Sequence, residues 1–224
     1  RLQGDWSSDV CSSDLGPRIE VEDRPGARYI DFLVPGLVGL NMLGAGMWGI
    51  GFNLTEYRSK KLLRRLFVTP LRRSEFLLGF LTSRLALMIP ESVVIIAFGM
   101  FAWGVPFRGS WLATLALLLA AALAFTGLGI LVACRARTTE GVAGLMNLVQ
   151  LPMWLLGGSF FSTERMEGFL GAFTRALPLT QCNLALRDLM LEPGSFAQIA
   201  SPLGFLLAVA AVSFALALRW FRWA

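Results

Sequence analysis

Five long apolar runs are the feature that most restricts how this chain can fold. They cover residues 29–54, 76–103, 111–134, 141–161 and 196–218. A helix that crosses a bilayer needs about 20 predominantly apolar residues, and most of these runs reach that length. Of the 224 residues, 55 % are hydrophobic and 16 % are charged, whereas soluble domains carry about 25 % charged residues. The sequence therefore predicts an all-α membrane protein with five transmembrane helices.

A strongly basic segment separates the first two apolar runs. From Glu56 to Glu75, seven basic residues stand against two acidic ones, which gives a local net charge of +5. Thr69-Pro70 is a helix-stop signal within this segment. Apolar residues recur before that signal at helical spacing, namely at Leu62, Leu63, Leu66 and Phe67. The pattern predicts a short amphipathic helix over residues 56–69 that lies along the membrane surface.

The distribution of basic residues predicts the topology. Basic residues also follow the third run, at 135–140, and the last run, at 219–224. Short cytoplasmic loops of membrane proteins are rich in Lys and Arg. We therefore expect these two segments and residues 56–75 on the cytoplasmic side of a bacterial inner membrane.

The outer side then receives the remaining connections. Residues 162–193 scatter charges among apolar residues around Pro178, which predicts two short re-entrant helices that do not cross the membrane. The turn at 106–108 also falls outside. A chain that starts outside is expected to have one further span upstream, which would make six.

The first residues have a different character. Asp5 to Leu15 reads DWSSDVCSSDL and resembles the translation of a sequencing adapter. We interpret residues 1–15 as a disordered, non-native scar and set them aside. Residues 16–28 are polar and predict an extracytoplasmic linker, and residues 29–224 form the membrane domain.

The composition argues against several kinds of chemistry. The sequence has no histidine, and its three cysteines, Cys11, Cys134 and Cys182, are widely spaced, so no metal-binding pattern is present. It has no G-x-x-x-x-G-K-[ST] phosphate loop. We therefore expect this chain to bind no cofactor. Basic residues cluster beside apolar runs rather than on a soluble face, which argues against nucleic-acid binding.

Three stretches resemble ABC type-2 permeases, the membrane subunits of ATP-binding-cassette exporters. The first is Tyr29–Gly36, reading YIDFLVPG. The second is the pattern Glu56-Tyr57-Arg58, Leu63, Leu66 and Thr69-Pro70. The third runs from Gly141 to Asn147 and on through Leu151–Phe161, then Arg175–Thr180. Their order and spacing together resemble the family over about residues 17–224.

The resemblance implies a fold of six spans per subunit, a dimer, and a separate ABC ATPase that holds ATP and Mg²⁺ on the cytoplasmic side. The amphipathic helix would then be the coupling helix that docks on that ATPase. The residues that this implies are Glu56, Arg58, Lys60, Lys61, Leu63, Arg64, Arg65, Leu66, Thr69 and Pro70. The alternative interpretation is a basic helix held by the anionic headgroups of membrane lipids. The exported substrate could be a drug, a lipid or a glycan.

Four polar residues within the apolar runs are candidates for lining or gating the translocation pathway, namely Arg84, Glu91, Asn147 and Gln150. Arg84 and Glu91 lie seven residues apart in the second run, about 10 Å apart along a helix. Charged groups inside a membrane face a bundle interior or water. Arg84 and Glu91 therefore either line or gate the pathway, or pair structurally with Asn147 or Gln150 on another span; the structural pairing is the interpretation we favour.

Two other functions remain alternatives. A secondary transporter would show inverted repeats, and none is visible. An intramembrane enzyme would need paired carboxylates, a Ser/His arrangement or metal ligands within its spans, and Glu91 alone does not supply them.

Overall fold

The computed structural model describes residues 29–60, 73–136, 138–159, 169–191 and 196–220. Within these ranges the chain is helical and contains no strand, which confirms the all-α prediction. The helices are α1 (Tyr29–Ser59), α3 (Arg73–Trp103), α4 (Trp111–Arg135), α5 (Thr139–Leu156), α6 (Phe169–Arg175), α7 (Pro178–Leu191) and α8 (Phe196–Trp220).

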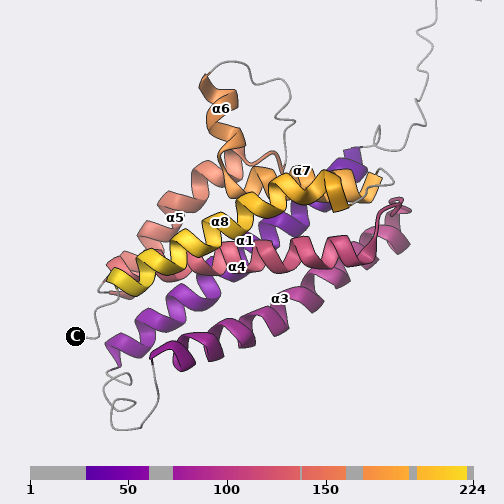
Figure 1. Cartoon of the computed structure of the whole chain (residues 1–224). Helices are drawn as coiled ribbons and strands as arrows, with labels where there is room; N and C mark the ends of the chain where they lie inside the picture. Colours follow the sequence, from indigo (N-terminus) through magenta and orange to yellow (C-terminus); the bar gives the residue numbers. More distant parts are fainter. Residues whose placement is uncertain (1–28, 61–72, 137, 160–168, 192–195, 221–224) are drawn as a thin grey trace, which may run out of the picture.

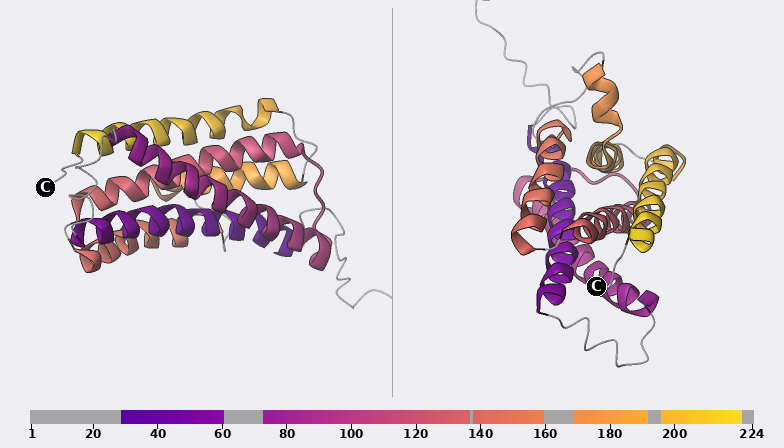
Figure 2. Two further views of the ribbon diagram at one scale, coloured as in Figure 1. Left: turned by 90° about the horizontal axis from the view of Figure 1, so that it is seen from below. Right: turned by 90° about the vertical axis from the view of Figure 1, so that its left-hand side faces the viewer.

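The long helices run side by side in alternating directions (Figures 1 and 2). Helices α1 and α4 pack against each other in the middle, α8 packs on α4, and α5 packs on α1. The ends of α1, α4 and α8 and the starts of α3 and α5 lie together at the end of the bundle marked C in Figure 1. This arrangement agrees with the topology expected from the basic residues, and we call this end the basic end and the opposite one the outer end.

Among the described residues, four helices are long and apolar enough to cross a membrane. They are Tyr29–Tyr57, Leu81–Trp103, Trp111–Arg135 and Gln198–Trp220. Helix α5 has 18 residues and is not among them, because Glu140, Asn147 and Gln150 reduce its hydropathy. A fifth span over this region therefore stays a prediction.

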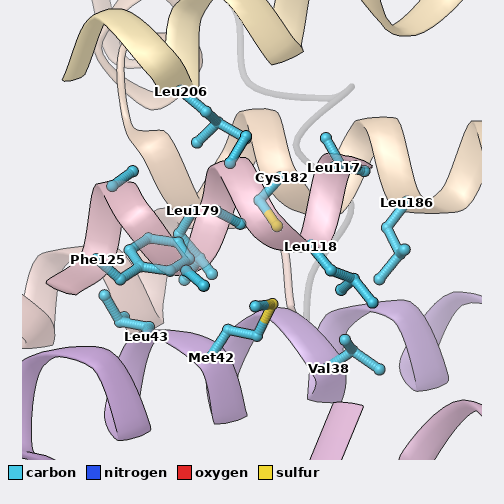
Figure 3. Close-up of a cluster of buried hydrophobic side chains, with 14 of the residues drawn as sticks. Val38, Met42, Leu43, Leu117, Leu118, Phe125, Leu179, Cys182, Leu186 and Leu206 are labelled. Atoms are coloured by element: carbon cyan, nitrogen blue, oxygen red, sulfur yellow. The ribbon is translucent and has the colours of Figure 1, made fainter. Parts of the chain in front are cut away.

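The core lies between α1, α4, α7 and α8 (Figure 3). Met42 and Leu43 of α1 meet Phe125 of α4, and all three are fully buried. A Cβ on Gly129 would lie 2.8 Å from the Cα of Met47, so the α1 and α4 backbones approach closely at this point. Small residues allow such close packing of helices in membranes.

Helix α5 begins and ends at local signals. The Thr138 hydroxyl accepts a hydrogen bond from the Gly141 amide at 3.1 Å, which caps the start of the helix. The helix ends at Leu156, where the sequence predicted a span to residue 161. The reason is Gly158, whose φ of +69° belongs to the left-handed region that favours glycine.

The expected boundary at Glu56 is also wrong. Helix α1 runs unbroken through Glu56 to Ser59, since no helix breaker stands between Leu54 and Ser59. Residues 56–59 are thus the last turn of α1 rather than the start of a separate helix. The rest of the predicted coupling helix lies outside the described residues.

Residues 162–193 contain the two short helices α6 and α7. Pro178 is the first residue of α7, a position where its missing amide hydrogen costs nothing. Ten of the 14 residues of α7 are buried. Helix α7 packs on α1, α8 and α4, and only slightly on α5. Although α7 is short, it is therefore part of the buried core of the helix bundle.

Candidate functional site

Two of the predicted coupling residues, Glu56 and Lys60, have side chains that the structure describes, and both lie at the basic end. The Lys60 ammonium donates to Glu56 Oε1 at 2.6 Å, across one helical turn. This contact and the nearby carboxylate charge raise the pKa of Lys60 above its usual value. The side chain of Arg58 is not described, and the other candidates lie outside the described residues: Lys61, Leu63, Arg64, Arg65, Leu66, Thr69 and Pro70.

Two further basic residues mark the same end. The Arg135 guanidinium carbon, at the end of α4, lies 5.5 Å from the centroid of the Trp220 ring at the end of α8. Arg219 is exposed beside Trp220. The end of the bundle where α1 ends and α3 begins therefore also carries cationic and aromatic side chains from the ends of α4 and α8.

Arg84 bonds to the backbone of α1. Its Nε and Nη2 donate to the Ala45 carbonyl oxygen at 2.9 and 2.8 Å. Gly49 makes room for the guanidinium, because a Cβ at that position would lie 1.9 Å from Cζ. The structural pairing with Asn147 or Gln150 that we favoured from the sequence is therefore wrong: the partner is a main-chain carbonyl, which no side-chain pattern encodes.

Gln150 joins α5 to α1. The indole Nε1 of Trp48 donates to Gln150 Oε1 at 2.7 Å, and Gln150 is 2 % exposed. Its Nε2 has no partner among the described residues. This bond is the polar contact between the middle of α1 and the middle of α5.

The other two pathway candidates face outward. Glu91 is exposed on α3, beside the exposed Pro90. Asn147 is exposed on α5, next to Leu148, which is 70 % exposed. Neither side chain joins Arg84 or Gln150 in a common cluster. The four candidates therefore do not form one site within this chain.

A polar cluster at the outer end was missed from the sequence. On α7, Asn183 Nδ2 donates to the Gly157 carbonyl at 2.9 Å and to the Ser159 hydroxyl at 2.8 Å. One turn later, Arg187 donates to the Gly158 carbonyl. These five residues, which we call the α5–α7 cluster, are all buried.

The α5–α7 cluster also touches α1. The Arg187 guanidinium carbon lies 3.4 Å from the centroid of the Phe32 ring, which is a cation–π contact. A Cβ on Gly36 would lie 2.7 Å from the Ser159 carbonyl oxygen, and one on Gly39 would lie 2.0 Å from Asn183 Oδ1. The sequence did contain a signal for this cluster. Asn183 and Arg187 lie four residues apart in a segment of short helices that follows Gly157-Gly158.

Comparison with known proteins identifies the family. Residues 19–219 match the sequence model described as ABC-2 family transporter protein. The chain is 26 % identical over 174 residues to ABC transporter G family member 20 of Dictyostelium discoideum, and this match covers 77 % of the chain and 24 % of that protein.

Two relatives from Escherichia coli strain K12 also match. The inner membrane transport permease YadH is 24 % identical over 166 residues, which cover 74 % of the chain and 63 % of YadH. The probable multidrug ABC transporter permease YbhR is 23 % identical over 199 residues, which cover 89 % of the chain and 54 % of YbhR. The chain thus spans less than two thirds of each relative. No solved structure matches. Because the family match covers most of the sequence, this chain belongs to the ABC-2 family of transporter proteins.

Proposed function

We propose that this chain is the membrane-spanning permease subunit of an ATP-driven exporter in a bacterial inner membrane. A separate ABC ATPase would bind ATP and Mg²⁺, and this chain would bind no cofactor of its own. Family membership supports this proposal, as do the names of YadH and YbhR, both of which are called permeases.

The observation that carries the coupling mechanism is the course of α1. This helix is continuous for 31 residues from the outer end to Ser59, so its last turn lies within the basic segment. It packs on α3, α4, α5 and α7. A push on the basic segment would move α1 as a rigid element, together with the helices bonded to it through Arg84 and Trp48.

We assign docking on the ATPase to the candidates named from the sequence. Lys60 directly follows α1 and pairs with Glu56 in the last turn of that helix, and because both side chains are partly or fully exposed, a partner can reach them. Arg64 and Arg65 follow within the same basic segment. Their positive charges would complement an acidic groove on the ATPase, and such electrostatic complementarity speeds encounter and fixes register.

We further propose that two permease chains associate, as a homodimer or a heterodimer. Helix α5 packs on α1 with one side, while Leu148, Leu151 and Leu155 are exposed on the other. Asn147 lies among them and is exposed. An Asn within a membrane helix gains by bonding across to a neighbouring helix. A second permease chain placed on this side of α5 would supply that helix, while lipids would cover the rest.

Co-purification tests the function. The full chain, solubilised from membranes with a mild detergent, is expected to bring down an ABC ATPase and to raise that ATPase's rate of ATP hydrolysis. Recovery of the chain without any ATPase, or with an ATPase whose rate does not change, would contradict the proposal. Cross-linking through Asn147→Cys tests the dimer: a cross-linked pair is expected from this variant and not from Gly204→Cys, an exposed position on α8.

A further inference from the structure

Helix α8 lies at the edge of the bundle (Figure 2). It packs on α4 and α7, and only 22 % of its most apolar stretch is buried. Exposed apolar residues recur along one side of it, at Leu207, Ala211, Ala215 and Leu218. Residues three or four positions apart lie on the same face of a helix. This side of α8 therefore faces the lipid of the membrane.

Two cationic side chains lie where this side of α8 ends. The apolar spans of α4 and α8 end at Arg135 and Trp220. The two helix ends are in contact, because the Cys134 thiol lies 3.8 Å from the Ala217 carbonyl oxygen and the Arg135 guanidinium lies over the Trp220 ring. Arg135 and Arg219 are both exposed. Two guanidinium groups thus stand at the level where the hydrocarbon core meets the lipid headgroups.

No acidic side chain in the described part of the chain forms an ion pair with Arg135 or Arg219. The described acidic residue nearest to Arg135 in the sequence, Glu140, belongs to α5, which packs on α1 and α4. A guanidinium group is planar and presents its N–H donors as a fork that fits the oxygens of a phosphate. The pair of arginines is therefore complementary to a phosphate ester.

We propose that the ends of α4 and α8 bind one anionic phospholipid from the leaflet at the basic end. Its phosphate would lie against Arg135 and Arg219, and one acyl chain would follow the exposed side of α8. We call this the α4–α8 lipid site. Basic groups between the ends of membrane helices are a known means of holding anionic headgroups.

The length of the exposed side of α8 fits an acyl chain. From Leu218 to Leu207 the helix rises by about 16 Å at 1.5 Å per residue. One leaflet supplies half of the hydrocarbon core, which is about 15 Å. The exposed stripe therefore runs from the headgroup level to about the middle of the membrane, as the acyl chain of one lipid does.

The partner ATPase is the other candidate for these two arginines. The basic segment assigned to that partner joins α1 to α3, whereas α8 packs on α4 and α7. The arginines also continue an apolar, lipid-facing stripe rather than a polar surface. These observations favour a lipid, and contact with the ATPase becomes an outcome of the test.

The first experiment measures lipid binding to the full chain in detergent by native mass spectrometry. Phosphatidylglycerol is compared with phosphatidylcholine of the same acyl chains. We expect one phosphatidylglycerol to bind preferentially, about 5-fold more weakly to Arg135→Gln or Arg219→Gln and about 30-fold more weakly to the double variant. Arg108→Gln is the matched control, because Arg108 is exposed in the connection between α3 and α4, and it should bind as the unaltered chain does.

Equal affinity of the double variant and the unaltered chain would overturn the site, as would equal affinity for the two lipids. Each single variant tests the site independently of the double variant. Glycerol phosphate then separates the headgroup from the acyl chain, because it has the charge and no chain. It should not displace phosphatidylglycerol at equal concentration, and displacement would show that the stripe on α8 plays no part.

The second experiment separates the lipid from the ATPase. In vesicles of uncharged lipid, Arg135→Gln/Arg219→Gln is expected to stimulate the partner ATPase as the unaltered chain does. Loss of stimulation in this variant alone would mean that the arginines contact the ATPase, and the lipid site would be overturned. If the unaltered chain stimulates no ATPase, the proposed function fails, while the lipid site is still decided by the binding of phosphatidylglycerol.

Discussion

Arg84 on α3 donates from both Nε and Nη2 to the carbonyl oxygen of Ala45 on α1. The guanidinium is thus held by a helix backbone rather than by a carboxylate, and it fills the space that Gly49 leaves open. A carbonyl that already accepts within its helix can accept a second bond, since it has two lone pairs. Arg84 therefore acts as a clamp that ties the helix after the basic segment to the helix before it.

Replacement of Gly49 tests this clamp. In Gly49→Ala the new methyl group would lie 1.9 Å from Arg84 Cζ, so the guanidinium must leave the Ala45 carbonyl. Hydrogen bonds to charged groups contribute about 1.5–3 kcal/mol, and we expect a loss of unfolding free energy in that range. Thermal unfolding in detergent measures it, with Gly44→Ala as the control. Equal melting temperatures for the two variants would show that the clamp contributes nothing.

Because Trp48 and Gln150 are hydrogen-bonded, replacing both is expected to change the stability by an amount that differs from the sum of the two single replacements. Trp48→Phe leaves the buried Oε1 of Gln150 without its donor, which should cost about 1–3 kcal/mol. Replacing both partners in Trp48→Phe/Gln150→Leu removes the unsatisfied group, so the double variant should be more stable than Trp48→Phe alone. Unfolding midpoints of the wild type, both single variants and the double variant complete the cycle. Additive losses would mean that the two side chains do not interact.

The end of α5 depends on glycine at one position. Gly158 has φ +69°, and a side chain in this conformation costs about 1–2 kcal/mol. We expect Gly158→Ala to lower the melting temperature. Gly144→Ala, in the middle of α5 with open space around it, should be neutral or gain about 0.5–1 kcal/mol from the lower flexibility of alanine. A stable Gly158→Ala variant would contradict the left-handed turn.

Cys182 predicts a dependence of stability on alkaline pH. Burial raises the pKa of this thiol from 9.0 to about 12. Below pH 9 the thiol is protonated in both the folded and the unfolded chain and has no effect. Between these two values the unfolded chain releases the proton and the folded chain keeps it, so stability falls as pH rises. Melting temperatures of the wild type and Cys182→Ala, compared at about pH 8 and about pH 10.5, isolate this contribution. The wild type should lose more stability than Cys182→Ala, and parallel losses would contradict it.

Local signals made part of this fold predictable. The expected apolar run begins at residue 141, close to the start of α5, where Thr138 caps the helix with a hydrogen bond inside its first turn. The alternation of apolar and basic segments predicted the helices and the sharing of one end by the basic segments. Helix α5 ends at Leu156, before the expected span limit of residue 161, because the left-handed conformation of Gly158 stops it.

The bonds that organise the polar groups could not be predicted in the same way. The acceptors of Arg84, Asn183 and Arg187 include backbone carbonyls on other segments. Every residue has such a carbonyl, so the sequence contains no pattern that singles out Ala45 or Gly158. Only the packing of the helices decides which carbonyl a long side chain reaches.

The central claim is that the basic segment transmits the action of a partner ATPase to α1. The most direct measurement is the rate of ATP hydrolysis by that ATPase in vesicles of uncharged lipid, which removes the attraction of anionic headgroups. Arg108→Glu is the control, because Arg108 is exposed in the connection between α3 and α4, away from the basic segment that precedes α3. We predict that the wild type and Arg108→Glu stimulate the ATPase, and that Arg64→Glu/Arg65→Glu, present in equal amount, does not. Undiminished stimulation by the double variant would contradict the account.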